Sequence, residues 1–486
     1  MNIRKESLAQ IVATTGPSSR TEEMLTKLAI AGVGVFRLNL SHDTHETHAE
    51  AIKNIKTVRE KTGKNIIILG DLQGPKLRIG VMRDNGVMLE DDQEFILTSK
   101  ECEGDEKQVY MNYSELPTSV KPGDMVLIDD GKIKLEVVST NGIDQVVTKV
   151  VNGGILRSRK GVNLPNTRVN LPCLTPKDLA DLDFAIEQDI DWIGLSFVRR
   201  DTDIIELRQQ ILARDSQLKI VAKIEKPEAL EYLDGIIEAS DGIMVARGDL
   251  GVEMSFEKVP LIQKEIVAKC IAAAKPVIIA TQMMESMITN FSPTRAEAND
   301  VANAVLEGAD AMMLSAETSM GEFPLESVQA MQKIISWTES KQPLTISSQP
   351  PVDTGRGHGY LTKSICYNAA ALAKQVDATG IIIFANSALS VRLVSSHRAA
   401  HAKIIVYTTI PELLRTLPLL WGVDVYLYPK FRTIGEAVHY AKRHILENNL
   451  LEEGTKVVYV GSTPFALERS NMVRLGRLEF DAGRQT

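Results

Sequence analysis

The chain has 486 residues, about three times the length of a typical domain, so we expect several hydrophobic cores. Its net charge of -8 gives no overall attraction to nucleic acid or to an anionic membrane, and we expect neither as a partner. No apolar run approaches the roughly 20 residues that span a bilayer, and the first residues do not resemble a secretion signal, which predicts a cytoplasmic location.

Eight short β-branched runs alternate with helical patterns along the first two thirds of the chain. Their near-continuous apolarity is typical of strands buried on both faces of a parallel sheet. Segments such as 44–61, 257–274 and 294–306 carry the apolar spacing of amphipathic helices. The alternation predicts an α/β fold with a (β/α)8 barrel. The eight runs are 11–14, 34–37, 66–69, 192–195, 220–223, 242–245, 277–280 and 311–314.

Two further domains are predicted around this barrel. After the third run, residues 74–171 change to short stretches of period two separated by turn residues, which indicates an inserted small β-barrel domain that can act as a lid. A Pro- and Gly-containing stretch at 340–359 is typical of a linker, and the runs beyond it predict an open, mostly parallel α/β sheet. We therefore expect the barrel at 1–73 and 172–343, the insert at 74–171 and a C-terminal domain at 344–486.

Each of the eight runs ends in polar chemistry, at its last residue or just after it. Barrel enzymes carry their active sites at the carboxyl ends of the strands, so we expect these side chains to converge. The residues concerned are Thr15, Arg37, Asn39, Asp71, Ser196, Lys223, Glu225, Arg247, Asp249, Thr281, Gln282, Ser315 and Glu317.

The spacing of these residues indicates metal-assisted phosphoryl chemistry. Residues two apart on a strand point the same way, so Lys223 with Glu225, and Arg247 with Asp249, are expected to project as pairs, as are Ser315 with Glu317. Two carboxylates, Glu225 and Asp249, suit a Mg²⁺ ion that keeps waters and shares substrate oxygens. Arg37 and Lys223 would neutralise a phosphoryl group. On spacing alone, a surface salt-bridge network remains the alternative.

Long motifs in the chain resemble those of pyruvate kinases from end to end. Eight motifs carry this resemblance, and the last three in the list that follows are the most specific. The motifs are IVATTGPSSR (11–20), VFRLNLSH (35–42), RKGVNLP (159–165), LSFVRR (195–200), AKIEKPEAL (222–230), IMVARGDLGVEM (243–254), IIATQMMESMI (278–288) and PTRAEANDVANAVLEGADAMMLSAETSMGEFPLE (293–326).

This resemblance implies a glycolytic enzyme that converts phosphoenolpyruvate and ADP to pyruvate and ATP, by in-line phosphoryl transfer followed by protonation of an enolate. It implies a homotetramer with a catalytic barrel, a lid and a regulatory C-terminal domain. It also implies Mg²⁺ as cofactor, with Mn²⁺ as a substitute.

The resemblance also assigns roles to residues by motif matching. Glu225 and Asp249 would hold Mg²⁺, Lys223 would stabilise the phosphoryl group during transfer, and Arg37 would bind the phosphate. The substrate carboxylate would be received by the backbone at Gly248 and Asp249 together with Thr281. ADP would lie near Asn39, His42, Arg78 and Lys160 as the lid closes. Thr281, Ser315 and Glu317 would position a water or relay for the enolate.

The segment DLQGPK, residues 71–76, departs from the family's usual Asp-Thr-Lys-Gly-Pro-Glu. Leu72, Gln73 and Lys76 replace the Thr, Lys and Glu that accompany a potassium ion, whereas Asp71 remains, as do the other matched ligands, Asn39 and Ser41. Family members with lysine at this place need no potassium, because the ammonium supplies the charge. The chain therefore resembles the bacterial-type, lysine-containing, potassium-independent subgroup.

The C-terminal domain departs further from the family pattern. Many members bind fructose bisphosphate through a Thr-x-Ser-Gly loop, whereas this chain has no glycine at 385–390, and 461–465 replaces a Gly/Pro-rich loop. Activation by fructose bisphosphate is therefore not expected. Ser387, Ser390 and Arg392 could bind another phosphorylated effector, and the alternative is a domain kept only for subunit contacts.

Two other classes of protein remain to be weighed. One is a different Mg²⁺-dependent barrel enzyme acting on phosphoenolpyruvate or pyruvate, such as a mutase or an aldolase, which has no use for the lid cations Arg78 and Lys160. The other is a catalytically silent scaffold, which should have lost a catalytic group. Turnover that depends on ADP would exclude the first, and against the second, Arg37, Lys223, Glu225, Asp249 and Thr281 are all present.

Overall fold

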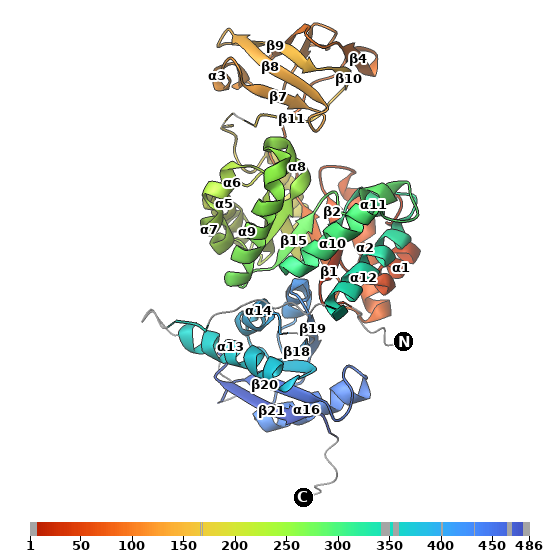
Figure 1. The fold of residues 1–486 in the computed structure, drawn as a ribbon, viewed down its shortest axis with the longest axis vertical. Coiled ribbons are helices and arrows are strands. Elements are labelled where there is room, and N and C mark those ends of the chain that lie inside the picture. Colours follow the sequence, from red (N-terminus) through yellow and green to blue (C-terminus); the bar gives the residue numbers. More distant parts are fainter. Residues whose placement is uncertain are drawn as a thin grey trace, which may run out of the picture.

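The computed structural model describes residues 7–165, 167, 169–341, 350–352, 359–399, 402–431, 433–463 and 469–479. These residues form three bodies along the long axis of the molecule (Figure 1). The barrel lies in the middle, the inserted β domain beyond one end and the C-terminal domain at the other. Most of the linker predicted at 340–359 lies outside the described residues.

Eight parallel strands close into a barrel in the order β1-β16-β15-β14-β13-β12-β3-β2. Seven of the eight predicted runs lie entirely within a strand, and the eighth, 66–69, begins one residue before β3, so the predicted (β/α)8 barrel is confirmed. The strands are β1 (Gln10–Thr14), β2 (Val33–Asn39), β3 (Ile67–Asp71), β12 (Trp192–Leu195), β13 (Lys219–Ile224), β14 (Gly242–Ala246), β15 (Val277–Ala280) and β16 (Ala311–Leu314).

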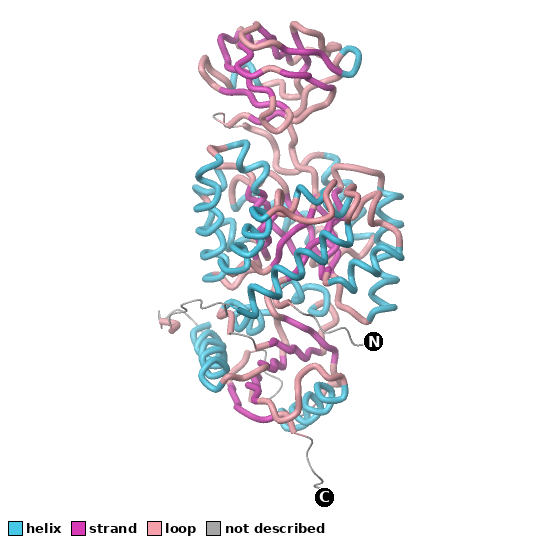
Figure 2. The backbone as a smooth tube through the Cα atoms, turned by 45° about the vertical axis from the view of Figure 1, so that its right-hand side comes forward, coloured by secondary structure: helices cyan, strands magenta, loops and turns pink. Residues whose placement is uncertain are grey.

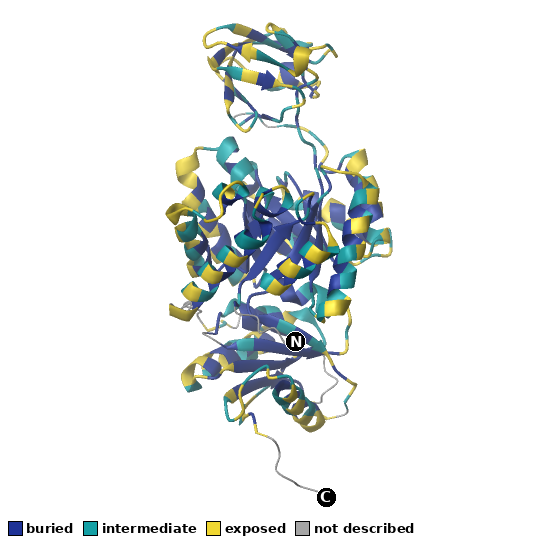
Figure 3. Ribbon diagram, turned by 90° about the vertical axis from the view of Figure 1, so that its right-hand side faces the viewer, coloured by how far each residue is buried: buried dark blue, intermediate teal, exposed yellow. Residues whose placement is uncertain are grey.

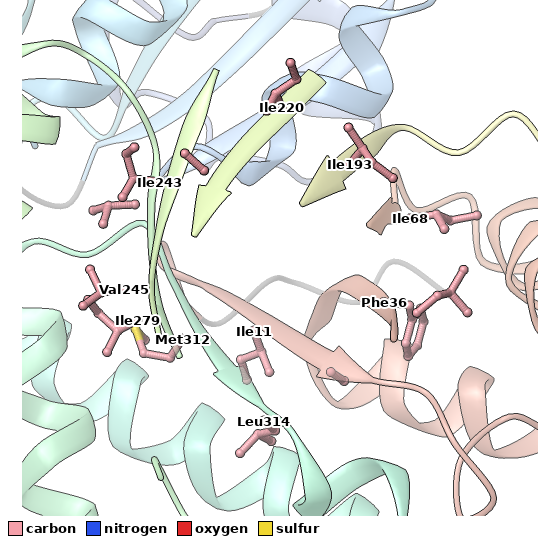
Figure 4. Close-up of a cluster of buried hydrophobic side chains, with 14 of the residues drawn as sticks. Ile11, Phe36, Ile68, Ile193, Ile220, Ile243, Val245, Ile279, Met312 and Leu314 are labelled. Atoms are coloured by element: carbon pink, nitrogen blue, oxygen red, sulfur yellow. The ribbon is translucent and has the colours of Figure 1, made fainter. Parts of the chain in front are cut away.

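Alternate residues of the strands enter two separate cores. One set, including Val12, Val35 and Met244, fills the inside of the barrel. The other set packs outward against the helices, and the ten members that Figure 4 labels come from all eight strands. Burial of both faces explains why these strands have continuous apolar runs rather than an alternating pattern.

Helices surround the strands, with their exposed faces turned outward (Figures 2 and 3). The three predicted helical segments correspond to α2, α9 and α10 below. The helices of this part are α1 (Glu22–Ala31), α2 (His45–Thr62), α4 (Pro176–Glu187), α5 (Asp201–Leu212), α6 (Glu228–Glu231), α7 (Leu233–Ala239), α8 (Arg247–Glu253), η2 (Phe256–Lys258), α9 (Val259–Ala272), η3 (Glu285–Ile288), α10 (Arg295–Glu307), α11 (Ala316–Ser319) and α12 (Pro324–Lys341).

The insertion between β3 and α4 is a β domain with its own core, which includes Phe95, Leu97 and Leu135. Its strands form a six-stranded sheet, β11-β7-β8-β9-β5-β6, and a two-stranded sheet, β10-β4, and isolated bridges connect residues 78, 79 and 82 with residues 161, 111 and 104. Its elements are η1 (Arg83–Asn85), β4 (Gly86–Leu89), β5 (Glu94–Thr98), β6 (Gln108–Tyr110), α3 (Leu116–Ser119), β7 (Met125–Ile128), β8 (Ile133–Thr140), β9 (Gln145–Asn152), β10 (Gly154–Arg157) and β11 (Val162–Asn163).

The C-terminal domain is an open five-stranded sheet in the order β19-β18-β17-β20-β21. The four predicted strands are parallel, and the fifth, β21, runs antiparallel to β20 and was not predicted. Its elements are α13 (Gly359–Val376), β17 (Gly380–Phe384), α14 (Ala388–Ser396), β18 (Lys403–Thr408), α15 (Leu413–Thr416), η4 (Leu417–Leu419), β19 (Val423–Leu427), α16 (Ile434–Glu447), β20 (Lys456–Gly461) and β21 (Met472–Arg477).

Two apolar side chains attach this domain to the barrel. Leu419 joins the core inside the barrel, and Trp421 joins the core between strands and helices. None of the helices in the described part of the chain combines the length and apolarity that crossing a bilayer requires.

Candidate active site

Charged side chains on the last residues of β2, β3 and β13, or just after them, meet at the carboxyl end of the barrel. The Nζ atom of Lys223 lies 3.0 Å from Oε1 of Glu225 and 3.2 Å from Oδ1 of Asp71, and it donates to Oγ of Ser196 at 2.7 Å. Arg37 contacts the other oxygen of Asp71, with Nε at 2.7 Å and Nη2 at 2.5 Å. Five of the residues listed for the strand ends, Arg37, Asp71, Ser196, Lys223 and Glu225, therefore form one continuous network.

Strand register explains why Asp71 lies at the centre of this network. Asp71 pairs with Asn39 of β2 on one side and with Gly194 of β12 on the other. A β-carbon at position 194 would lie 3.0 Å from Oδ1 of Asp71, so any larger residue would force the carboxylate to move. Glycine at 194 therefore gives the carboxylate its space inside the barrel mouth.

The network keeps its central groups ionised despite burial. Burial opposes charge on Asp71, yet Lys223 and Arg37 hold its pKa below the ordinary value. Burial also opposes charge on Lys223, but Asp71 and Glu225 raise its pKa. The pKa of Glu225 is raised, first by burial and then by the negative charge of Asp249, against the effect of Lys223. Two carboxylates therefore repel each other in a dry site, and a bound cation would relieve that repulsion.

The donor set of Glu225 and Asp249 fits a hard divalent cation. Glu225 is fixed in orientation because its Oε2 accepts the N–H of Phe197 at 2.7 Å while Oε1 contacts Lys223. Among the described residues, no three His, Cys, Asp or Glu side chains are grouped so that they could hold a metal by themselves. Two carboxylates without further protein ligands suit Mg²⁺, which completes its shell with waters and substrate oxygens.

Arg247 and Asp249 do not project as a strand pair, and that expectation was wrong. β14 ends before Arg247, and both residues lie in the first turn of helix α8, where the two-residue alternation of a strand does not apply. Arg247 turns instead to α10, where its Nη1 donates to Oδ1 of Asp300 at 2.8 Å. The N–H of Gly248 donates to Oγ1 of Thr281 at 2.7 Å, so the candidate carboxylate residues lie together.

Ser315 and Glu317 likewise follow a strand rather than extend it, since β16 ends at Leu314 and α11 begins after Ser315. Glu317 accepts the N–H of Ser315 at 2.7 Å and the N–H of Met284 at 3.2 Å, and burial raises its pKa. It thereby joins the loops after β15 and β16. Within the described residues, no hydrogen bond connects Glu317 to Thr281.

The four nucleotide candidates come from two domains. The N–H of His42 donates to the carbonyl of Asn39 at 3.1 Å in the barrel. Burial lowers the pKa of His42, and the charge of Arg78 from the inserted domain lowers it further, so these two side chains lie near each other. Lys160 is held within the inserted domain by an ion pair of 2.8 Å with Asp129. Arg78 lies beside Lys160 within the inserted domain, since Arg78 forms a bridge with Gly161 and the N–H of Ile79 donates to the carbonyl of Lys160 at 3.0 Å. Asn39 and His42 lie on the barrel, so the candidates form one pair in each domain.

The residues matched to a monovalent-cation site surround the same strand end. Oδ1 of Asn39 accepts the N–H of Ser41 at 3.3 Å. Both oxygens of Asp71 already contact cationic side chains of the network, as described above. Leu72 is buried and offers no side-chain ligand. A protein cation therefore already occupies much of the coordination capacity of Asp71.

Lys76 lies half-buried at the first residues of the inserted segment. Its charge contributes to lowering the pKa of His42, after burial and after Arg78, which places it beside the nucleotide candidates. Its stem packs against Gly161, where a β-carbon would lie 3.3 Å from Cε of Lys76. Among the described residues, its Nζ has no hydrogen-bond or ion-pair partner.

Sequence reasoning missed a link between lid and barrel. Asn163 of β11 donates to Oε1 of Glu253 at 2.8 Å, and Glu253 also pairs with Lys226. These residues help line a cavity of about 30 Å³ at the base of the lid. Glu253 ends α8, the helix that begins with Arg247, so the lid bonds directly to the helix that carries Asp249. No sequence spacing signals a contact between residues so far apart.

The three effector candidates do not converge. Oγ of Ser390 is buried and shares a hydrogen bond of 2.8 Å with Ser470. Burial lowers the pKa of Arg392, and the opposing charge is Asp241, so Arg392 faces the barrel. Ser387 begins α14 as its N-cap residue. The other loop that departs from the family pattern, 461–465, is only partly within the described residues.

Two family models match the chain. The model described as pyruvate kinase, barrel domain, matches residues 6–328, and the one described as pyruvate kinase, alpha/beta domain, matches residues 363–475. Among similar proteins, the pyruvate kinase of Agrobacterium vitis is 41% identical over 96% of this chain and 97% of its own length. That of Mycobacterium tuberculosis strain H37Rv is 37% identical over 97% of this chain and 98% of its own.

A solved structure agrees with these matches. The crystal structure of a pyruvate kinase from Cryptosporidium parvum superposes with a TM-score of 0.90 at 35% identity, over 97% of this chain and 96% of that one. Enzymes of this kind in general depend on magnesium and are typically tetramers. The matches favour a kinase over the mutase, the aldolase and the silent scaffold. The chain belongs to the pyruvate kinase family and is an enzyme that converts phosphoenolpyruvate and ADP to pyruvate and ATP.

Proposed function

We propose that Arg37 and Lys223 bind and stabilise the phosphoryl group that moves from phosphoenolpyruvate to ADP. The observation that carries this role is the buried network in which Lys223 lies 3.0 Å from Glu225 and 3.2 Å from Asp71. An ammonium fixed by two carboxylates and a hydroxyl does not need to reorganise when charge develops on the transferring group. Asp71 contacts both cations and keeps them in place.

Glu225 and Asp249 are the proposed magnesium ligands. When bound, the ion would neutralise charge on the substrate oxygens. Glu225 is oriented for this role by Lys223 and by the N–H of Phe197. Asp249 is presented by the first turn of α8.

The substrate carboxylate is proposed to lie at the start of α8, against the main chain of Gly248 and Asp249 and the hydroxyl of Thr281. Main-chain N–H groups in a first helical turn have no intrahelical acceptor and suit an anion. After transfer the enolate needs a proton, for which we propose a water positioned by Thr281 and Ser315. Glu317 supports this step by fixing the main chain of Ser315 at 2.7 Å.

ADP is proposed to bind between Asn39, His42, Arg78 and Lys160. Asn39 and His42 belong to the barrel at 1–73 and 172–343, whereas Arg78 and Lys160 lie on neighbouring segments of the insert at 74–171, and closure of the insert would bring Lys160 to the phosphates. The ion pair of 2.8 Å between Lys160 and Asp129 must exchange for this to happen. The remaining domain, 344–486, has the proposed regulatory and assembly role.

Lys76 is proposed to replace the potassium ion, which places this enzyme in the lysine-containing, bacterial-type subgroup that does not require it. Within the part of the chain that the structure describes, its ammonium has no hydrogen-bond or ion-pair partner, and its charge lowers the pKa of His42, after burial and the charge of Arg78, which supports this role. The same charge that a bound ion would bring is then covalently attached.

A phosphorylated effector at Ser387, Ser390 and Arg392 has little geometric support, because Arg392 faces the barrel and Ser390 contacts Ser470. An assembly role for this domain is the simpler proposal. We also propose a cytoplasmic location, in keeping with the substrates.

Binding of Mn²⁺, followed by electron paramagnetic resonance with phosphoenolpyruvate present, tests the metal assignment without relying on turnover. We expect Glu225→Gln and Asp249→Asn to weaken binding by about tenfold to a hundredfold. Glu228→Gln, which removes a carboxylate paired with Arg200 on the same rim, should leave it unchanged. Equal binding by all three variants would contradict the assignment.

A further inference from the structure

Arg247 makes an unusual number of contacts for a residue that lies beside the proposed carboxylate site. Its Nη1 donates to Asp300 Oδ1 at 2.8 Å, and Nη2 lies 2.8 Å from Asp300 Oδ2. The same Nη2 donates to the carbonyl of Thr281 at 2.8 Å and to that of Gln282 at 3.3 Å. Nη1 also lies 3.4 Å from Oε1 of Gln263. The guanidinium thus joins α8, α10 and the loop after β15.

The two carbonyls that Arg247 contacts belong to a strained turn. Thr281 has φ 68° and Gln282 has φ 53°. Positive φ is uncommon for any residue with a side chain and is unfavourable for a β-branched one such as Thr. Such a conformation persists only where the surrounding structure enforces it. The bonds from Arg247 to both carbonyls are the contacts that favour this turn over a relaxed one.

The strained turn determines where the Thr281 hydroxyl lies. Oγ1 of Thr281 accepts the N–H of Gly248 at 2.7 Å and donates to the carbonyl of Ala280 at 2.6 Å. A β-carbon at Gly248 would lie 3.2 Å from Oγ1, so hydroxyl and α8 main chain are packed closely. If φ of Thr281 relaxed, the hydroxyl would leave the first turn of α8.

Arg247 is not free to act as a ligand for an anion itself. Its side chain is 11% exposed, and Asp300 neutralises its charge through two contacts. Its remaining contacts are with the main-chain carbonyls of Thr281 and Gln282 and with the side chains of Gln263 and Met283, so each of its terminal nitrogens already has partners within the protein. Its effect on substrate must therefore pass through the residues that it holds.

We propose that Arg247 is a positioning residue for the substrate carboxylate: by bonding the Thr281 and Gln282 carbonyls while paired with Asp300, it maintains the turn that places the Thr281 hydroxyl at the start of α8. This inference rests on the proposed role of Thr281 and Gly248 in binding the carboxylate. It predicts a defect in phosphoenolpyruvate binding rather than a general loss of folding or of nucleotide binding. Lysine cannot substitute fully, because one ammonium does not reach the planar set of acceptors that a guanidinium contacts.

Steady-state kinetics of the full-length enzyme test the proposal. We expect Arg247→Met to raise KM for phosphoenolpyruvate by about tenfold or more, since small misplacement of a binding group has large effects. KM for ADP should stay within about twofold. Arg247→Lys retains the charge beside Asp300 and should give an intermediate KM for phosphoenolpyruvate, which also keeps the test valid if Arg247→Met folds poorly.

Arg208 provides a matched control at the other end of the barrel. It also pairs with one carboxylate, Asp241 at 2.7 Å, and contacts two main-chain carbonyls, those of Leu218 and Ala239. Arg208→Met should lower the melting temperature and leave both KM values unchanged. The proposal is overturned if Arg247→Lys has the KM of the unmodified enzyme, or if Arg247→Met raises both KM values together.

Thr281→Ala distinguishes failure of this inference from failure of the proposed function. If Thr281→Ala raises KM for phosphoenolpyruvate but the Arg247 variants do not, only the positioning role is wrong. If Thr281→Ala has no effect, the carboxylate assignment itself is wrong. In the double variant Arg247→Met, Thr281→Ala, we expect the two effects on KM to be far from additive, because both act on one hydroxyl.

Discussion

The two ends of the barrel both carry buried charges, but the charges have different partners. At the end facing the C-terminal domain, three aspartates directly precede β12, β14 and β16, and each accepts a main-chain N–H of an adjacent strand while it pairs with an arginine. The sets are Asp191 with Ile68 and Arg59, Asp241 with Ile220 and Arg208, and Asp310 with Val277 and Arg398.

At the carboxyl end, the charges contact mainly one another. Lys223 contacts Asp71, Glu225 and a serine hydroxyl, and Arg37 contacts Asp71 and Thr14. Aspartates that bond main-chain N–H groups fix the strands, so their charge serves the fold. Cations that bond only side chains can share those partners with an incoming anion. Burial and ion pairing alone therefore do not identify a functional site. What distinguishes the two ends is whether the charged groups bond main-chain N–H groups or other side chains.

The largest expected effect is on Lys223. Lys223→Met should lower phosphoryl transfer by a factor on the order of 10³ or more, because the fixed ammonium is lost from the transferring group. Exchange of the pyruvate methyl protons with solvent should remain measurable by nuclear magnetic resonance. Equal loss of both activities would show that the carboxyl end does not separate the two steps.

Arg398 tests the opposite end. It is 3% exposed, and its partner Asp310 is 1% exposed. Arg398→Met should lower the free energy of unfolding by about 3 kcal/mol, because it leaves a buried carboxylate unpaired. Urea denaturation measures this change, with Lys27→Met as the control, since the Lys27–Glu23 pair is exposed and contributes little. If Arg398→Met also raised KM for phosphoenolpyruvate strongly, the division into an end that stabilises the fold and an end that binds substrate would be contradicted.

Lys76 tests whether a cation at the carboxyl end serves the ligand. Lys76→Glu should make turnover depend on potassium by about tenfold, since the ion would then replace the missing charge. Lys121→Glu makes the same charge change at an exposed position of the inserted domain and should create no such dependence. A Lys76→Glu enzyme that is equally active with and without potassium would contradict the proposed role.

The smallest expected effect concerns the base of the lid. Asn163→Ala removes the hydrogen bond of 2.8 Å to Glu253. It should raise KM for ADP by about threefold, because water can partly replace a hydrogen bond from a neutral amide to a carboxylate. KM for phosphoenolpyruvate should change less. If KM for phosphoenolpyruvate rose more than KM for ADP, the bond would support α8 rather than the lid.

Much of the fold was predictable because it depends on local pattern. The eight barrel strands have continuous apolar runs, and each lies where the pattern places it. β21 was missed because it is an edge strand with exposed residues and no apolar run. The prediction that Arg247 and Asp249 project to the same side of a strand failed because β14 ends at Ala246 and α8 begins at Arg247. The two-residue spacing holds only within a strand.

The candidate site was predictable in its residue types but not in its contacts. Strand ends identified Arg37, Asp71, Lys223 and Glu225. The hydroxyl of Ser196 on Lys223 and the N–H of Phe197 on Glu225 were not predicted, since they depend on the register of β12 and on a positive φ of 55° at Phe197. Long-range bonds of this kind follow from the closed barrel and have no signal in a single sequence.

The central claim is that the charges at the carboxyl end serve an anionic substrate. Its most direct test is pyruvate formation by the unmodified enzyme from phosphoenolpyruvate, ADP and Mg²⁺, once in potassium chloride and once in tetramethylammonium chloride of equal ionic strength. We predict turnover at equal rates in both salts. No turnover in either salt would contradict the assignment of this end to phosphoryl transfer, and turnover only with potassium would contradict the account of Lys76.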